Sequence, residues 1–489
     1  MIALGVIVAY LAVLLTVGLG STRLAKDTGD DFFLASRSIG PFLMVMSLFG
    51  TTMTAFALVG STGKAYTVGI GTYGLMASWA AVVHPLMFAF VGVPVWYLGR
   101  RHGYTTQIEL LRDRFRSDLL GWLLFPLLVG LVIPYLLIGI QAAGITVAAV
   151  TKGVWAEGVG IPGWLTGAVV CAVVLTYVFY GGIRGAAWAN ALQTCVFLVV
   201  AAVAFFTLAD ALGGPVAATA ATAAKRPDLL VRTEHITQAH FASYGLVGLS
   251  VGMFPHIFQH WLSARSAETL KFPVALHPLL VAAVWLPCVL IGVWAGGVLD
   301  VPPEKANAVL GMMVAKFTSP VMSGILTAGI LAAIMSSLDS QFLCLGTLFT
   351  HDVALRRNPD VDDKTRVAVG RRFIIAIVTL TWCLSLFESR SVFDLGVWCF
   401  SGFSGLVPLI LAALYWRRAT AAGAIASVVA TGLTWLGLFL SDPGSPGEYL
   451  VAGVMPVTWI VLASTASLIV VSYATKPPSP EALARFFPH

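Results

Sequence analysis

The sequence predicts an all-α polytopic membrane protein of about thirteen transmembrane helices. Of its 489 residues, 58% are hydrophobic and 11% are charged, whereas a soluble domain carries about 25% charged residues. The apolar residues form runs of roughly 20, the length that crosses a bilayer as a helix. Charged residues are concentrated in the short connectors between these runs. No period-two alternation typical of a membrane barrel is visible, so helices are expected to satisfy the backbone.

Thirteen apolar runs define the expected spans. They are 2–20, 41–60, 72–98, 119–150, 163–181, 188–212, 242–257, 273–299, 319–350, 373–389, 393–416, 420–441 and 449–475. When the connectors are counted alternately, most of the 29 Lys and Arg residues fall in one set, which the positive-inside rule assigns to the cytoplasm. We therefore expect a multi-pass protein of the plasma membrane, the inner membrane of a bacterium, with its N-terminus outside and its C-terminus in the cytoplasm.

Several function classes are disfavoured by composition. The net charge of +6 is scattered among loops rather than gathered on one face, so no nucleic acid is expected as a partner. The six cysteines lie in apolar runs without metal or redox spacing, which predicts buried packing residues and no disulfide. We see no nucleophile or metal-ligand constellation and expect neither an enzyme nor an organic cofactor. The expected partners are a small-molecule solute and the lipid bilayer, with no obligatory protein partner.

Two spans contain internal breaks at matching positions. The second span carries GTTMTA at residues 50–55, and the short seventh span contains three glycines and Pro255. Unwound helix frees backbone carbonyls that can bind a cation at mid-membrane depth. The two broken spans begin consecutive five-helix blocks, 41–212 and 242–416, and because five is odd the second block must insert with inverted topology. The alternative is that these Gly and Thr residues only permit close helix packing.

The ninth span contains polar groups in an otherwise apolar helix. Ser336, Ser337 and Asp339 lie in the run AAIMSSLDS at residues 332–340. An ionisable group inside a membrane span is costly and indicates function. The two hydroxyls, together with carbonyls of the second span, would provide oxygen ligands for sodium. Alternatively, the serines hydrogen-bond to carbonyls of their own helix.

Four segments resemble the sodium/solute symporter family in the correct order and spacing, and the similarity covers nearly the whole chain. They are DFFLASRS at 31–38, GGIRGAAWANALQ at 181–193, AAIMSSLDS at 332–340 and LYWRRAT at 414–420. The resemblance implies a LeuT-like fold, a five-plus-five inverted repeat within a single transporter domain, 1–475. Helix 2–20 would precede the repeats 41–212 and 242–416, two helices in 420–475 would follow, and 476–489 would be a mobile cytoplasmic tail.

The resemblance also implies a sodium site, with Na+ as the coupling ion. Its ligands would be carbonyls of Gly50, Met53 and Ala333 and hydroxyls of Ser336 and Ser337. The sequence departs from the family pattern at two positions outside these five ligands. Asn190 stands where the family has an aspartate, and Thr52 stands where some members have Asn or Asp. Because both changes remove a charge or a stronger ligand, they favour transport of one sodium ion per cycle.

The solute is expected near mid-membrane, between the broken helices and the third, eighth and tenth core helices. The candidate residues are Thr51, Thr54, Phe56, Tyr135, Gln141, Met253, His256, Ser401 and Ser404. The pair Pro255–His256 resembles one found in monocarboxylate-transporting relatives, and a histidine there can hydrogen-bond a carboxylate. Alternatively, His256 and His260 mark the inner end of the helix.

The sequence therefore predicts a secondary active transporter. It would carry a small organic solute, best a monocarboxylate or similar small polar metabolite, into the cell with sodium by alternating access. The alternatives are a proton-coupled symporter, with Asp339 or His256 titrating, and an uncoupled facilitator of a sugar or amino acid on the same fold.

Overall fold

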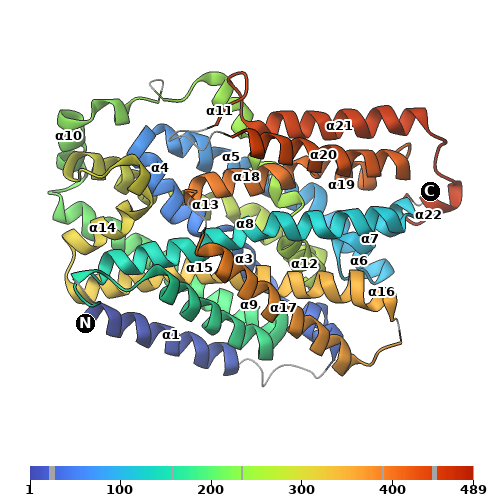
Figure 1. The fold of residues 1–489 in the computed structure, drawn as a ribbon, viewed down its shortest axis with the longest axis horizontal. Helices are drawn as coiled ribbons and strands as arrows, with labels where there is room; N and C mark the ends of the chain where they lie inside the picture. Colours follow the sequence, from blue (N-terminus) through green and yellow to red (C-terminus); the bar gives the residue numbers. More distant parts are fainter. Residues whose placement is uncertain are drawn as a thin grey trace.

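The protein is a bundle of helices whose longest members run roughly parallel to one another (Figure 1). The computed structural model describes residues 1–20, 28–155, 158–232, 235–358, 360–387, 390–442 and 449–487. The N-terminus lies at one end of the bundle and the C-terminus at the other.

The helical elements keep the labels of Figure 1. In chain order they are α1 (Ile2–Gly20), α2 (Gly29–Leu34), η2 (Ala35–Arg37), α3 (Pro41–Thr52), η3 (Phe56–Gly60), α4 (Ser61–Val68), η4 (Tyr73–Ser78), α5 (Trp79–Met87), η5 (Phe88–Gly92), α6 (Val93–His102), α7 (Gln107–Phe115), α8 (Asp118–Val150), α9 (Gly163–Ala211), α10 (Pro215–Lys225), η7 (Pro227–Leu230), α11 (Gln238–Tyr244), η9 (Val247–Gly252), α12 (Pro255–Ser263), α13 (Ala267–Val298), η10 (Pro303–Ala308), α14 (Val309–Phe317), α15 (Pro320–Phe349), η11 (Thr350–Ala354), α16 (Leu355–Arg357), α17 (Asp363–Ser385), α18 (Val392–Gly405), α19 (Val407–Tyr415), α20 (Ala421–Ser441), α21 (Pro456–Ala474) and α22 (Pro480–Ala484).

Ten helical segments of the described chain are long and apolar enough to cross a membrane, and two bent pairs raise the number to twelve. The predicted count of thirteen is therefore not confirmed. One reason is α9, which runs for 49 residues where two spans were expected. At 1.5 Å per residue it would be about 74 Å long, more than twice the hydrocarbon thickness of a bilayer. Its backbone leaves the helical region at Gly182, with φ 54° and ψ −150°.

The two predicted helix breaks are the two bent pairs. The segment Pro41–Thr52 meets Phe56–Val68 at 52°, and Gln238–Gly252 meets Pro255–Ser263 at 50°. At the first break the Thr54 hydroxyl accepts a hydrogen bond from the Phe56 amide, which caps the next helical segment. At the second break Phe254 is extended, the conformation favoured before proline, and Pro255 begins α12.

The helices differ strongly in burial. In α15 and in the segment formed by α18 and α19, more than four-fifths of the most apolar stretch is buried, against about a quarter in α1, α17, α20 and α21. The polar residues of α15 are therefore enclosed by other helices, whereas α1, α17, α20 and α21 lie at the periphery. This arrangement places Ser336, Ser337 and Asp339 in the protein interior.

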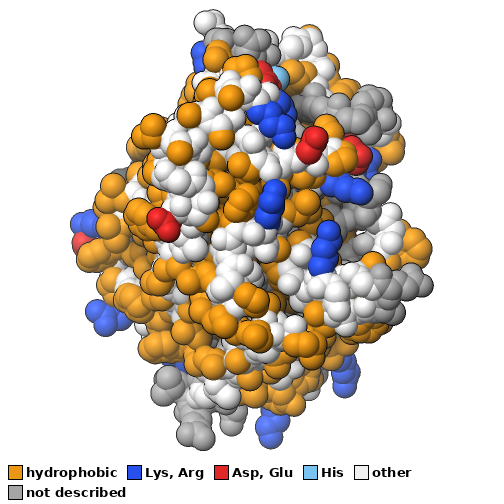
Figure 2. Space-filling view, turned by 90° about the vertical axis from the view of Figure 1, so that its left-hand side faces the viewer, with side chains coloured by type: hydrophobic (Ala, Val, Ile, Leu, Met, Phe, Trp, Pro, Cys, Tyr) orange, Lys and Arg blue, Asp and Glu red, His pale blue; other side chains and the backbone are white. Residues whose placement is uncertain are grey.

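The two ends of the bundle carry different elements. The helices α4, α10 and α14 lie at the end near the N-terminus, and α7, α16 and α22 lie at the end near the C-terminus (Figure 1). Figure 2 looks onto the first of these ends, where hydrophobic side chains cover most of the surface and charged side chains appear as separate groups. Lys64 and Lys225 belong to the first end and Arg112 and Arg356 to the second, as the alternating connectors require.

Residues of the C-terminal tail contact the end of the bundle. Phe486 is 8% exposed, and its ring stacks near Tyr104 with centroids 6.4 Å apart. Arg485 pairs with Asp113 of α7 at 3.1 Å. The aromatic ring of Phe486 packs against rings at the end of the bundle.

Candidate ion and solute site

The break in α3 lies against the middle of α15. The Ser336 hydroxyl is 2.8 Å from the Gly50 carbonyl oxygen and 2.8 Å from the Ala333 carbonyl oxygen. One hydroxyl has a single proton, so it can donate to only one of these carbonyls at a time. Three oxygens from two helices thus converge in the interior, where Ser336 has no exposed surface.

Gly50 is required by the close approach of a third helix. A Cβ atom on Gly50 would lie 2.2 Å from the Thr194 hydroxyl oxygen of α9. That hydroxyl is held by its own hydrogen bond to the Met46 carbonyl, at 2.8 Å. Because Gly50 lies in the last turn of α3, its carbonyl has no regular partner further along the helix. The carbonyl is therefore available to a group on α15.

The other two predicted sodium ligands lie nearby in the chain but make different contacts. The Ser337 hydroxyl donates to the Ile334 carbonyl of its own helix at 2.9 Å, as the alternative interpretation of these serines expected. Met53 is buried at the end of α3 with φ −88° and ψ 75°, outside the helical region. The structure thus brings Gly50, Ala333 and Ser336 together. The neutral oxygens of this group suit a hard monovalent cation.

A buried chain of polar groups continues from this point along α15. The Asp339 carboxylate accepts hydrogen bonds from the Tyr177 hydroxyl at 3.0 Å and from the Ser340 hydroxyl at 3.1 Å. The Asn190 amide donates to Ser340 at 3.0 Å. Sequence reasoning singled out Asp339 and Asn190 separately and missed Tyr177. The available signal was the hydroxyl of Tyr177, one of two tyrosines in the apolar run 163–181.

Aromatic rings from several elements form a compact cluster between the two breaks. The ring of Tyr135 in α8 lies 5.3 Å from Phe254, 5.6 Å from His256 and 5.0 Å from Phe400, measured between centroids. Phe56 joins the cluster through Phe400, at 5.0 Å. The structure therefore brings three of the predicted solute-site residues into one cluster, with Phe254 and Phe400 as additions that sequence reasoning did not include.

Two polar side chains at the breaks have buried atoms that no described residue satisfies. Neither ring nitrogen of His256 has a hydrogen-bond partner, although the side chain is fully buried. The Thr51 hydroxyl is likewise buried and has no hydrogen-bond partner among the described residues. Buried polar groups are nearly always hydrogen-bonded in proteins. The unsatisfied nitrogens of His256, beside Tyr135 and Phe254, indicate a place where a polar ligand can be held.

Four other predicted solute residues use their polar atoms within the protein. Ser401 donates to the Val397 carbonyl of its own helix at 2.6 Å, and Ser404 donates to the Val247 carbonyl at 3.2 Å. The Met253 carbonyl accepts from the Gln107 amide at 3.3 Å. The Thr54 hydroxyl is the cap described above. Of these four contacts, those of Ser404, Met253 and Thr54 involve the broken helices, whereas that of Ser401 lies within α18.

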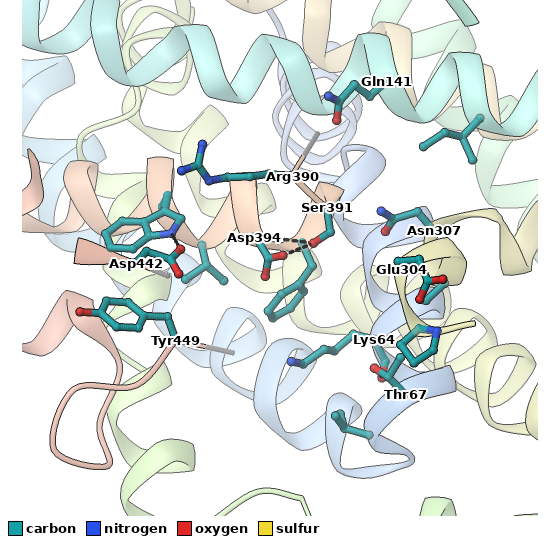
Figure 3. Close-up of a pocket in the computed structure, with 18 of the residues that line it drawn as sticks. Lys64, Thr67, Gln141, Glu304, Asn307, Arg390, Ser391, Asp394, Asp442 and Tyr449 are labelled. Atoms are coloured by element: carbon teal, nitrogen blue, oxygen red, sulfur yellow. Dashed lines mark hydrogen bonds between the residues drawn. The ribbon is translucent and has the colours of Figure 1, made fainter. Parts of the chain in front are cut away.

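A large cavity opens above the aromatic cluster. It has a volume of about 1400 Å³, and its lining includes Lys64, Gln141, Arg390, Phe393 and Asp394. Figure 3 shows these polar side chains approaching one space from α4, α8 and the start of α18. The Lys64 ammonium lies 4.6 Å from the Phe393 ring centre. Gln141 thus belongs to this vestibule, apart from Tyr135.

Phe393 closes the vestibule on the side of the helix breaks. Its ring stacks on Phe56 with centroids 5.4 Å apart and an interplanar angle of 20°. Phe56 in turn contacts Phe400 of the aromatic cluster. The vestibule therefore leads to the cluster and is separated from it by stacked rings.

Known proteins resemble this chain along most of its length. The model of the sodium:solute symporter family matches residues 32–431. The chain belongs to this family. The symporter is 27% identical over 445 residues to the sodium/pantothenate symporter of Escherichia coli strain K12, with 88% of this chain and 89% of that protein covered. It is 25% identical over 480 residues to the sodium/proline symporter of Haemophilus influenzae, with 92% and 90% covered.

Solved structures identify the fold of the symporter. The outward-open, substrate-bound Na+-coupled sialic acid symporter aligns with a TM-score of 0.77 at 18% identity, covering 98% of this chain and 99% of that one. Mhp1, a nucleobase-cation-symport-1 family transporter, aligns with a TM-score of 0.55. The fold is LeuT-like, as the sequence predicted. The symporter is thus a membrane transporter of a sodium-coupled family, and that family consists of transporters rather than enzymes.

Proposed function

We propose that this symporter carries a small organic solute with a single carboxylate into the cell together with sodium, by alternating access. The observation that carries the proposal is the convergence of the Gly50 and Ala333 carbonyls on the Ser336 hydroxyl. A passive facilitator would have no use for neutral oxygens gathered at a helix break. A cation is the ligand class that such oxygens bind.

In this proposal sodium binds beside α15 at five residues. The carbonyls of Gly50, Met53 and Ala333 and the hydroxyls of Ser336 and Ser337 would be its ligands. Ser336 already faces the two carbonyls. Ser337 would turn its hydroxyl away from the Ile334 carbonyl, which a single χ1 rotation allows. Sodium would thereby join α3 to α15.

The solute assignment depends on chemistry shared by the transported compounds of several relatives. Proline, pantothenate and sialic acid, which appear in the names of related proteins and of the solved structure, each carry one carboxylate. The unsatisfied atoms of His256 and Thr51 would bind that group, because each side chain can donate a hydrogen bond. The aromatic cluster around Tyr135 would pack against the rest of the molecule.

Proton coupling is the second candidate, and Asp339 favours it. The carboxylate is fully buried, and among the described residues only Tyr, Ser and Asn side chains hydrogen-bond to it. A carboxylate in a membrane span without a basic partner is costly in the ionised form. Binding of a proton would neutralise the Asp339 carboxylate.

Transport into proteoliposomes separates these candidates. An inward sodium gradient at equal pH should drive accumulation of at least one member of a panel consisting of lactate, pyruvate, proline and pantothenate, with glucose as the uncharged control. Potassium in place of sodium should abolish accumulation. Accumulation driven by a pH gradient in sodium-free buffer would instead establish the proton-coupled alternative.

We propose in addition that the N-terminus faces the outside and that 41–212 and 242–416 are inverted repeats within one transporter domain. The matching bends of 52° and 50° support the repeat assignment. With this orientation the vestibule beside Lys64 opens outward. Labelling of Gly5→Cys by an impermeant thiol reagent in intact cells tests the orientation, against Arg357→Cys as the control that should stay unlabelled.

A further inference from the structure

A hydrogen bond joins the two helices that begin or end at the breaks. The Ser47 hydroxyl of α3 lies 2.6 Å from Nε2 of His260 in α12. Both side chains are almost completely buried. Ser47 precedes Gly50 by three residues, so both lie in the last turns of α3. His260 follows His256 by four residues, so both lie on one face of α12.

The direction of each hydrogen bond in this region follows from its partners. Nδ1 of His260 lies 2.7 Å from the His256 carbonyl oxygen, which can only accept, so Nδ1 carries the proton. In the neutral ring Nε2 is then an acceptor, and Ser47 must donate to it. The Ser47 oxygen accepts in turn from the Asn190 amide, at 3.4 Å.

The Asn190 amide continues the chain to the helix that carries the proposed sodium ligands. It also donates to Ser340 of α15 at 3.0 Å, and Ser340 donates to Asp339 at 3.1 Å. An uninterrupted set of buried hydrogen bonds thus runs from the His256 carbonyl to Asp339. Within such a network each bond depends on its neighbours staying in place.

A second connection fixes the far ends of the same two helices. The Ile39 amide, just before α3, donates to the Ser263 carbonyl at the end of α12, at 3.1 Å. The Arg265 amide donates back to the Ile39 carbonyl at 2.9 Å. Hydrogen bonds at His260 and at Ile39 thus connect α3 and α12 at two points along their length.

We propose that His260 is the positioning residue that transmits sodium binding at Gly50, in α3, to His256 in α12. The inference depends on the proposed sodium site and goes beyond it by assigning the coupling to a contact that touches neither ion nor solute. Loss of a buried hydrogen bond of this kind changes an equilibrium about tenfold. Sodium that fixes the end of α3 would thereby also fix the start of α12.

Hydrogen–deuterium exchange with sodium alone as the probe tests this inference. Sodium chloride, compared with potassium chloride at equal concentration, should slow exchange of peptides from both 41–53 and 254–263 in the wild-type protein, by about tenfold. In His260→Ala sodium should protect 41–53 alone. His260→Gln keeps an acceptor near the position of Nε2 and should retain protection of both segments.

A matched control and a second variant complete the experiment. Ser427→Ala removes a buried 2.8 Å hydrogen bond to Ser464 between α20 and α21, and both segments should stay protected by sodium. Ser47→Ala should reproduce His260→Ala, and it serves as the test if the histidine variant does not fold. Equal protection of 254–263 in wild type and in both alanine variants would overturn the inference. Sodium that protects neither segment of the wild type would overturn the proposed sodium site itself.

Discussion

At the scale of single residues, the proposed sodium site depends on oxygens of one glycine and one serine. Gly50 allows α9 to approach α3, and Ser336 faces the carbonyl that the break leaves free. Ser336 was predicted from its hydroxyl in an otherwise apolar helix, and Gly50 from the resemblance to the sodium/solute symporter family. The present direction of the Ser337 hydroxyl was not predictable, since a serine in a helix can bond either its own backbone or a neighbour.

Gly50→Ala should weaken sodium binding at least tenfold. The new methyl group would lie 2.2 Å from the Thr194 oxygen, so α3 or α9 must shift and the Gly50 carbonyl moves with it. The change is measured by sodium titration of the purified protein. Gly5→Ala in α1 has open space around its Cβ and should bind sodium like the wild type. Gly50→Ala combined with Thr194→Ala should regain part of the affinity, and an unaltered affinity in Gly50→Ala alone would contradict the packing argument.

The two serines should differ in their contributions to sodium-dependent uptake. Ser336 faces carbonyls of two helices, whereas Ser337 faces its own helix. We expect Ser336→Ala to raise the sodium concentration for half-maximal uptake more than Ser337→Ala does, by about tenfold for one lost charge-assisted contact. A larger effect at Ser337 would show that the ion lies on the other face of α15.

At the scale of elements, the breaks were predictable and the contacts between distant segments were not. Pro255 and the glycines at both breaks determine local backbone conformation, so they indicate where the helices bend. The aromatic cluster instead combines Tyr135 of α8 with Phe400 of α18, which are more than 260 residues apart. The bend at Gly182 in α9 falls between the predicted spans 163–181 and 188–212, so the apolar runs did indicate this interruption.

Helix α7 shows how a short element outside the spans contributes to stability. Burial opposes ionisation of Glu109, but hydrogen bonds from His351 and from the amides of Thr105 and Thr106 outweigh it and hold the pKa of Glu109 below its ordinary value. The same carboxylate forms a capping box with Thr106 at the start of α7. The ionised form of Glu109 therefore stabilises the folded state.

The sign of this effect gives a pH prediction. Because the pKa is lowered on folding, the stabilisation is present above the ordinary pKa of glutamate and is lost as the pH falls through the lower value of the folded protein. Glu109→Gln should reduce the free energy of unfolding by about 1–2 kcal/mol at pH 7, and by less in acid. Thermal unfolding of the wild type and of Glu109→Gln, at pH 7 and in acid, measures this difference in stability. Glu268→Gln, in an exposed pair with Lys271, should show no such difference.

At the scale of the whole molecule, the two ends of the bundle are built differently. One end opens into the vestibule beside Lys64. At the other end α7 contacts several segments, and the tail packs across it through Phe486 and Arg485. This asymmetry corresponds to a transporter whose site is reached from one side while the other side is held closed.

The tail should stabilise the closed end mainly through its aromatic residue. Phe486 is 8% exposed, so Phe486→Ala should cost about 2–4 kcal/mol. Arg485 is about half exposed, so Arg485→Ala should cost about 0–1 kcal/mol. Thermal unfolding of the two variants measures the difference. Equal and negligible effects would mean that the tail is not held in this position.

The most direct test of the central claim is sodium binding to the purified symporter. Isothermal titration should detect sodium but not potassium binding to the wild-type protein, and the variant with Ser336→Ala and Ser337→Ala should bind no sodium while it unfolds at nearly the same temperature. Equal sodium affinity in wild type and double variant would contradict the account, because the ion would then lie away from the contact between α3 and α15.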